Sequence, residues 1–132
     1  MNKNSDLVTI KTFQSNGDLQ IIHGYGGGGF RIGGNRFAGS VIVTPRHTSL
    51  WKPPTPDMLT ANALTALLAI DLPPLLLLGV GASPLHPLQE FAVELKQQGM
   101  ALELMSTAAA CRTWNVLLSE GRNAAAALYA VA

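Results

Sequence analysis

The sequence is poor in charge. Charged residues make up 13% of the 132 residues, about half of the usual share, and the formal net charge at pH 7 is only +1. A nearly neutral chain lacks the basic surface through which proteins bind nucleic acid or an anionic membrane. We therefore expect no nucleic-acid partner.

Cysteine is almost absent as well, and no catalytic set is apparent. Cys111 is the only cysteine, so no disulfide can form within the chain, which fits a reducing compartment. Cys111 and a histidine would make a nucleophile–base pair, but Cys111 lies on the apolar stripe of a predicted helix, where we expect it to be buried and inert. The histidines His23, His47 and His86 are far apart and share no ligand spacing. The sequence therefore predicts no catalytic residue, no metal site and no cofactor.

Long hydrophobic runs are missing too. The longest apolar stretch, residues 72–82 (LPPLLLLGVGA), is broken by two prolines and is too short to span a bilayer, so we expect no membrane insertion. The first residues, MNKNSDLVTIK, lack the apolar core of a signal peptide and the arginine-rich amphipathic pattern of a transit peptide. These observations predict a cytoplasmic protein.

The first third of the chain has the pattern of antiparallel β structure. Residues 7–13 (LVTIKTF) alternate apolar and polar side chains, which is typical of a half-buried strand, and residues 19–23 (LQIIH) read as the next strand. Gly33, Gly34 and Asn35 favour a hairpin turn, because glycine reaches positive φ without a Cβ clash. Residues 40–44 then continue as a buried strand.

A glycine run, residues 23–30 (HGYGGGGF), contains the spacing G-x-G-x-x-G. A dinucleotide-binding fingerprint needs a strand before the glycines and a helix directly after them, because the helix N-terminus binds the pyrophosphate. Here the glycines are followed by another turn and β pattern. We therefore predict a structural bend that joins β elements where two backbones approach closely.

The middle of the chain is rich in proline, and we expect residues 45–59 to form a crossing loop that Trp51 fixes to the core. Thr60 can cap the helix that follows. The spacing of its apolar residues predicts an inner face made of Leu64, Leu67, Leu68 and Ala63.

The second half of the chain follows the order β-α-β-α-β, as in a parallel sheet. Residues 75–78 (LLLL) are so apolar that both faces of this strand need cover. The alanine-rich tail reads as a strand, because Gly121 has just stopped a helix. The elements between them are a helix from Pro87 to Gly99, a strand at residues 101–105, and a helix from Ser106 or Thr107 to about Glu120.

Two loops should lie at one edge of this sheet, because parallel strands end on the same side. One loop follows residues 75–78 with the sequence GVGASP, a weak G-x-G signal in which Pro84 replaces the third glycine, and a tight turn is the alternative reading. The residues that we predict at a binding site there are Gly79, Gly81, Ser83, Ser106, Thr107 and Arg112. Arg112 also belongs to a polar set, with Asn115, Glu120 and Arg122, that either ties the end of the last helix to the surrounding backbone or forms a recognition surface.

Several motifs together resemble a known family. They are a glycine-rich β start, the strand GSVIV at residues 39–43, Trp51 in a proline-bearing loop, and a leucine-rich strand that ends in G-x-G. The pattern A-x-x-T-aromatic-N-x-L-x-x-E-G-R matches residues 110–122. From about residue 7 to its end, the chain resembles the domain-of-unknown-function family DUF498, which includes the mitochondrial complex I assembly factor numbered three and the adipogenesis-associated Mth938 domain-containing protein.

The resemblance implies a three-layer α/β fold, with a mixed sheet, packed helices and the final segment as a strand. It supplies no catalytic residues. We thus expect a single domain over residues 1–132, flexible at residues 1–6, that binds a protein partner and aids respiratory-complex assembly by analogy. The alternative is a binding protein or enzyme for a small anionic ligand, using the loops at 79–86 and 105–112. A homodimer stays open.

Overall fold

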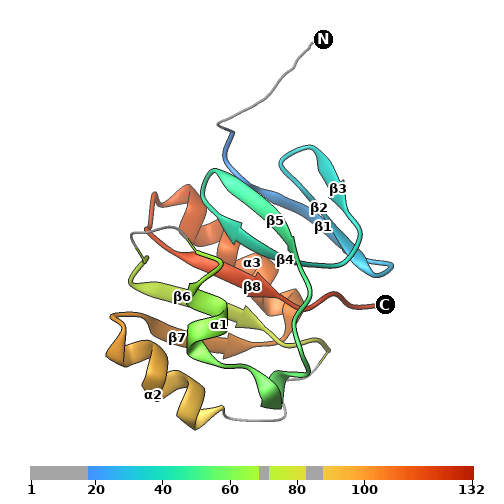
Figure 1. Cartoon of the computed structure of the whole chain (residues 1–132). Coiled ribbons are helices and arrows are strands. Elements are labelled where there is room, and N and C mark those ends of the chain that lie inside the picture. Colours follow the sequence, from blue (N-terminus) through green and yellow to red (C-terminus); the bar gives the residue numbers. More distant parts are fainter. Residues whose placement is uncertain (1–17, 69–71, 83–87) are drawn as a thin grey trace.

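The computed structural model describes residues 18–68, 72–82 and 88–132. The predicted strand at 7–13, the flexible residues 1–6 and the predicted helix start at Pro87 lie outside these ranges. The first described elements form an antiparallel three-stranded sheet (Figure 1). Its strands are β1 (Ile22–Gly26), β2 (Gly29–Ile32) and β3 (Asn35–Phe37).

A second sheet has five strands in the order β5-β4-β8-β6-β7. It is mixed, because β4 is antiparallel to β5 and β8, whereas β6 is parallel to both β7 and β8. The alanine-rich tail forms a strand, as the sequence predicted, and the structure places this strand at the centre of the sheet. The bounds are β4 (Ser40–Thr44), β5 (His47–Trp51), β6 (Leu75–Gly79), β7 (Ala101–Met105) and β8 (Ala125–Leu128).

Helices complete a three-layer α/β fold, which confirms the predicted fold class. The helices are α1 (Ala61–Thr65), α2 (Gln89–Gln97) and α3 (Thr107–Ser119). One face of the five-stranded sheet packs against α3 and the three-stranded sheet, and the other face packs against α1 and α2 (Figure 1). The predicted ends of α3 are confirmed, because the Ser106 hydroxyl caps its first turn and Gly121 follows its last with φ +70°.

The central strands explain why the sequence of the second half is so apolar. In β8, Ala126 lies in the core on the α3 side, whereas Ala125 and Ala127 lie in the core on the α1–α2 side. In β6, Leu77 faces α3 and its two neighbours face the other helices. A strand buried on both faces has no polar alternation, and the small alanines let the layers pack closely.

Gly79 sets the distance between α3 and the sheet. A Cβ atom at this position would lie 2.9 Å from the Thr107 Cα, 3.0 Å from the Ala110 Cβ and 3.1 Å from a Leu128 methyl group. The first glycine of the G-x-G sequence is therefore required for close helix–sheet packing.

The glycine run at residues 23–30 joins two β elements, as predicted. It forms the end of β1, a turn at Gly27 and Gly28 with positive φ, and the start of β2. A Cβ at Gly29 would collide with the carbonyl oxygen of Phe37 in β3. Close approach of two backbones is thus the physical reason for glycine there. The strand predicted at residues 19–23 begins later, at Ile22.

The predicted crossing loop at 45–59 was wrong for residues 47–51. These residues form β5, which pairs with β4 from Thr44↔His47 to Ser40↔Trp51. The cluster of prolines begins only after the strand, at Pro53, so it does not interrupt the pairing. As an edge strand, β5 also needs only one neighbour. Trp51 is buried in the core, as predicted.

The predicted inner face of α1 was partly wrong. Thr60 caps the helix, its Oγ1 accepting a hydrogen bond from the Ala63 amide at 3.2 Å, and Leu64 is buried. However, Ala63 and Leu67 are exposed, and Leu68 is half-buried. The helix ends at Thr65. Helical spacing therefore does not apply to Leu67 and Leu68, which follow it.

We expect Gly79→Ala to destabilise the protein by about 1–3 kcal/mol, because the added methyl group overpacks a buried contact. Urea unfolding followed by circular dichroism would measure this change. Gly24→Ala is the matched control, because a Cβ at Gly24 meets nothing within 4 Å. Equal stability of the two variants would contradict the packing role of Gly79.

Candidate functional site

The structure brings the two predicted loops together at one edge of the sheet. Gly79 at the end of β6 is in register with Met105 at the end of β7 and with Leu128 at the end of β8. The helix α3 begins at the same edge with Ser106 and Thr107. Of the residues predicted there, Ser83 lies outside the described residues.

Thr107 connects these segments through hydrogen bonds, and its side chain is fully buried. Its hydroxyl accepts a hydrogen bond from the Gly81 amide at 2.9 Å and donates one to the Tyr129 carbonyl at 2.8 Å. Its own amide donates to the Gly81 carbonyl at 2.8 Å. We call this set the Thr107 clamp. The amides of Gly81 and Thr107, which could otherwise donate to an anionic ligand, therefore already have partners within the protein.

Some polar residues in and just after α3 bind neighbouring segments, and others are exposed to solvent. The side chain of Asn115 accepts from the Ile22 amide and donates to the Ile22 carbonyl, both at 2.9 Å, so it ties β1 to α3. The neighbouring Trp114 indole donates to the Gln20 carbonyl at 2.8 Å. Arg112 is exposed. Glu120 and Arg122 form an exposed contact at 3.9 Å, a kind that contributes little stability.

Cys111 is buried on the inner face of α3. Burial raises the pKa of its thiol to about 12, against a smaller opposing effect of the Arg112 charge. A nucleophilic cysteine needs the opposite shift, towards the thiolate. The geometry therefore does not support Cys111 as a nucleophile.

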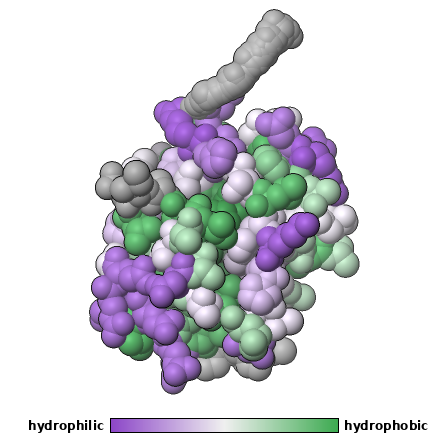
Figure 2. Space-filling view, in the orientation of Figure 1, coloured by the Kyte–Doolittle hydropathy of each residue, from purple (hydrophilic) through white to green (hydrophobic). Residues whose placement is uncertain are grey.

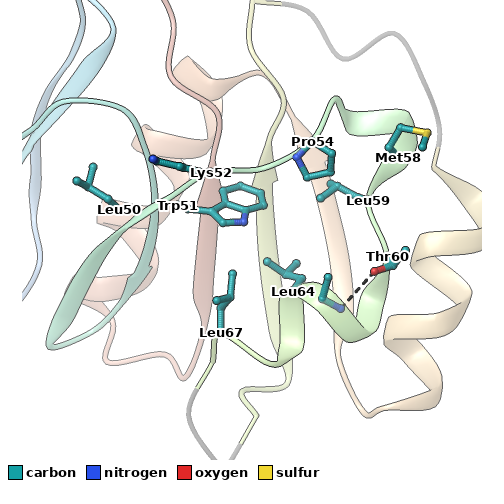
Figure 3. A pocket seen from close by; sticks show the side chains of 10 residues that line it. Leu50, Trp51, Lys52, Pro54, Met58, Leu59, Thr60, Leu64 and Leu67 are labelled. Atoms are coloured by element: carbon teal, nitrogen blue, oxygen red, sulfur yellow. Dashed lines mark hydrogen bonds between the residues drawn. The ribbon is translucent and has the colours of Figure 1, made fainter.

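A cavity that sequence reasoning missed lies between β5 and α1. It has a volume of about 280 Å³. Figure 3 shows Trp51 in the middle of its lining, with Leu64 and Leu67 from the α1 region on one side of the ring and the proline-bearing connection on another. We call this surface the apolar face. Its lining residues are Leu50, Trp51, Lys52, Pro54, Met58, Leu59, Thr60, Ala63, Leu64 and Leu67.

Tyr129 contacts two lining residues of the apolar face, Trp51 and Pro54. Its ring packs edge-on against the Trp51 ring with 5.2 Å between the centroids. Its hydroxyl donates to the Pro54 carbonyl at 2.7 Å, and its amide donates to the Gly79 carbonyl at 2.8 Å. Burial, and to a smaller extent Asp57, raises the pKa of Tyr129 to about 12, so the hydroxyl remains a donor at neutral pH.

Large hydrophobic side chains are unusually exposed around this cavity. Met58 is 66% exposed, Leu50 59% and Leu67 53%. Figure 2 shows hydrophobic residues gathered over the middle of this side of the molecule, while hydrophilic residues cover α2. Grouped exposed apolar side chains mark interaction sites more often than single ones do.

The lining of the apolar face is mostly apolar. Among the residues that the structure describes, Lys52 is the only charged one in this lining. In residues 18–68, 72–82 and 88–132, no group of three or more metal-ligating side chains comes together. No helix in this part of the chain is long and apolar enough to cross a membrane. The face can therefore take up apolar side chains of another molecule.

The sequence carried a weak signal for this face. The segment LWKPPTPDML places apolar residues in a connection that prolines keep from becoming a buried strand or helix. Only the contact with Tyr129, 75 residues away in the chain, shows that this connection lines a cavity.

Known proteins are similar in sequence to most of this chain. A model of the family described as "Protein of unknown function (DUF498/DUF598)" matches residues 22–129. An uncharacterized protein of Rhodobacter capsulatus is 41% identical over 107 residues, which are 81% of this chain and 82% of that protein. The NADH dehydrogenase [ubiquinone] 1 alpha subcomplex assembly factor 3 of Danio rerio is 36% identical over 110 residues, which are 82% of this chain and 63% of that protein.

Solved structures show the same fold. A Mth938-like domain of Bordetella pertussis is 25% identical, with a TM-score of 0.70, covering 98% of this chain and 92% of that one. A Bartonella henselae protein, described as an outer membrane protein, is 34% identical, with a TM-score of 0.71, covering 87% and 98%.

Replacing Thr107 tests the clamp. We expect Thr107→Val to destabilise the fold by about 1–3 kcal/mol, because it leaves the partly buried Gly81 amide and Tyr129 carbonyl without their partner. Thr107→Ser keeps the hydroxyl and should lose less stability. Chemical unfolding would measure the stability of both variants. A valine variant as stable as the wild type would contradict a stabilising role of the Thr107 clamp.

Thiol labelling tests the state of Cys111. A pKa of about 12 in place of 9.0 lowers the thiolate fraction at pH 7 by about a thousandfold. We expect the native protein to react with a thiol reagent only slowly, and the protein unfolded in guanidinium chloride to react at once. Rapid labelling of the native protein would show that Cys111 is reactive.

Proposed function

The chain belongs to the DUF498/DUF598 family, and on this premise we propose that it is a non-enzymatic protein-binding domain that aids respiratory-complex assembly. The observation that carries the binding role is the apolar face, where exposed Met58 and Leu67 surround a cavity next to Trp51. The assembly role is supported by the relatives named as complex I assembly factors.

The chain matches only part of each vertebrate assembly factor. The matched region spans about three-fifths of their length, 63% for Danio rerio and 58% for Mus musculus. The family match, residues 22–129, includes β1 to β8 and therefore both layers that form the apolar face. The proposal is therefore that assembly depends on this shared domain and that the domain acts in the cytoplasm.

The apolar face suits a protein partner for physical reasons. Its exposed side chains are long and flexible Met and Leu residues that can adapt to an apolar surface. Behind them, Trp51 and Tyr129 provide a rigid wall. In many interfaces, a few well-packed aromatic residues supply most of the binding energy, and the residues around them contribute less.

The alternative, a small anionic ligand at the loops 79–86 and 105–112, has less support. The Gly81 amide and the Thr107 hydroxyl already have partners within the Thr107 clamp. The Ser106 hydroxyl accepts from the Ala109 amide at 3.2 Å. A ligand that used these groups would therefore have to displace hydrogen bonds within the fold.

The double variant Met58→Asp with Leu67→Asp tests the proposed function. Two carboxylates on the apolar face should weaken partner binding by about tenfold or more, because charges are strongly disfavoured in the core of an interface. The measurement is affinity capture from the native cell with mass spectrometry, together with the amount of assembled complex I on native gels. Both the capture of complex I subunits and the assembled complex should fall.

The matched control is Val93→Asp with Val116→Asp. These valines are exposed to 56% and 54% and lie on α2 and α3, away from the cavity. Circular dichroism should show that both double variants fold. Unchanged capture and assembly in the Met58/Leu67 variant, or equal loss in the control, would contradict the proposal.

A further inference from the structure

Two arginines lie directly opposite each other on the three-stranded sheet. In the register of β1, β2 and β3, Gly24 pairs with Arg31, and Arg31 pairs with Arg36. The neighbouring row, with Phe30 and Phe37, packs into the core. Because side chains alternate between the faces of a sheet, the row with both arginines occupies the outer face.

This outer face is exposed and carries unbalanced charge. Arg31 and Arg36 are both exposed, and among the described residues neither has an ion pair. Residues 19–56 contain four lysines or arginines and no aspartate or glutamate. Like charges directly opposite each other in a sheet destabilise the pairing, so the fold bears a cost here that a negatively charged partner would remove.

The glycines leave room beside the guanidinium groups. A Cβ at Gly24, in the same row, would meet nothing within 4 Å. Arg36 reaches over the turn between β1 and β2, where its guanidinium donates to the Gly27 carbonyl at 3.3 Å. This bond fixes the position of Arg36 and leaves its other donors available. The surface beside Gly24 is therefore positively charged and open.

We propose that the outer face of the three-stranded sheet binds an extended acidic segment of a protein partner through Arg31 and Arg36. Alternate residues of an extended chain are about 6.6 Å apart on one side, a spacing that two long arginine side chains on adjacent strands can meet. Guanidinium groups bind carboxylates through paired hydrogen bonds. Two arginines in a chain of net charge +1 are too few for a polyanion such as DNA, whose binding proteins typically contact about 6–10 phosphates.

A nuclear magnetic resonance titration of the full chain tests this inference. The probe is a capped six-residue peptide that alternates glutamate and threonine, and its control alternates glutamine and threonine. The glutamate peptide should shift the amides of Gly24, Arg31 and Arg36, and its binding should weaken as salt screens the charges. The glutamine peptide should not bind.

Charge reversal supplies the second arm of the test. Arg31→Glu with Arg36→Glu should lower the affinity for the glutamate peptide at least about fivefold. The matched variant, Lys96→Glu with Arg122→Glu, makes the same change in net charge away from this sheet and should bind normally. Arg31→Glu alone replaces a like-charge pair by an opposite-charge pair, so it should weaken binding without lowering Tm.

Several results would overturn the inference. They are equal binding of the two peptides, shifts confined to other parts of the chain, or equal losses in the two double variants. Tighter binding of phosphatidylserine vesicles or of an oligonucleotide to the same amides would assign the surface to a different partner. The cavity variant Met58→Asp with Leu67→Asp should bind the peptide normally, so this test and that of the apolar face fail independently.

Discussion

The close approach of α3 to the end of β6 is the constraint on which the rest of the structure depends. Gly79 has no side chain that would separate the two elements, and Thr107 joins the loop after β6, the start of α3 and the segment after β8. A buried threonine with both hydrogen-bonding functions satisfied stabilises such a junction, because leaving either partner unpaired is costly. The G-x-G sequence thus serves packing, although its spacing also occurs in nucleotide-binding proteins.

The same junction leads to the apolar face on the other side of the sheet. The clamp holds the carbonyl of Tyr129, the Tyr129 ring packs on Trp51, and its hydroxyl holds Pro54. Residues that the sequence suggested as a ligand site therefore position a surface for apolar contacts.

The sequence predicted the features that local physics determines. The β-α-β-α-β order, the Ser106 cap, the inner stripe of α3 and the glycine turns follow from hydrophobic periodicity and backbone sterics, and the family motif was recognised correctly. The strand β5 was missed because the prolines that follow it dominated the interpretation, and Leu67 was misplaced because α1 is short. The apolar face and the bond between Asn115 and Ile22 join residues 75 and 93 positions apart, and no local pattern encodes such pairings.

Site-specific photo-crosslinking in the native cell tests the central claim, that a protein partner docks on the apolar face, most directly. A photoreactive amino acid would replace Ala63, which is exposed and lines the cavity, or Ser119 on α3 as the reference position. We expect a discrete crosslinked protein from position 63 and none from position 119. Crosslinks from position 119 alone, or none from position 63 while the partner is still captured, would contradict this claim.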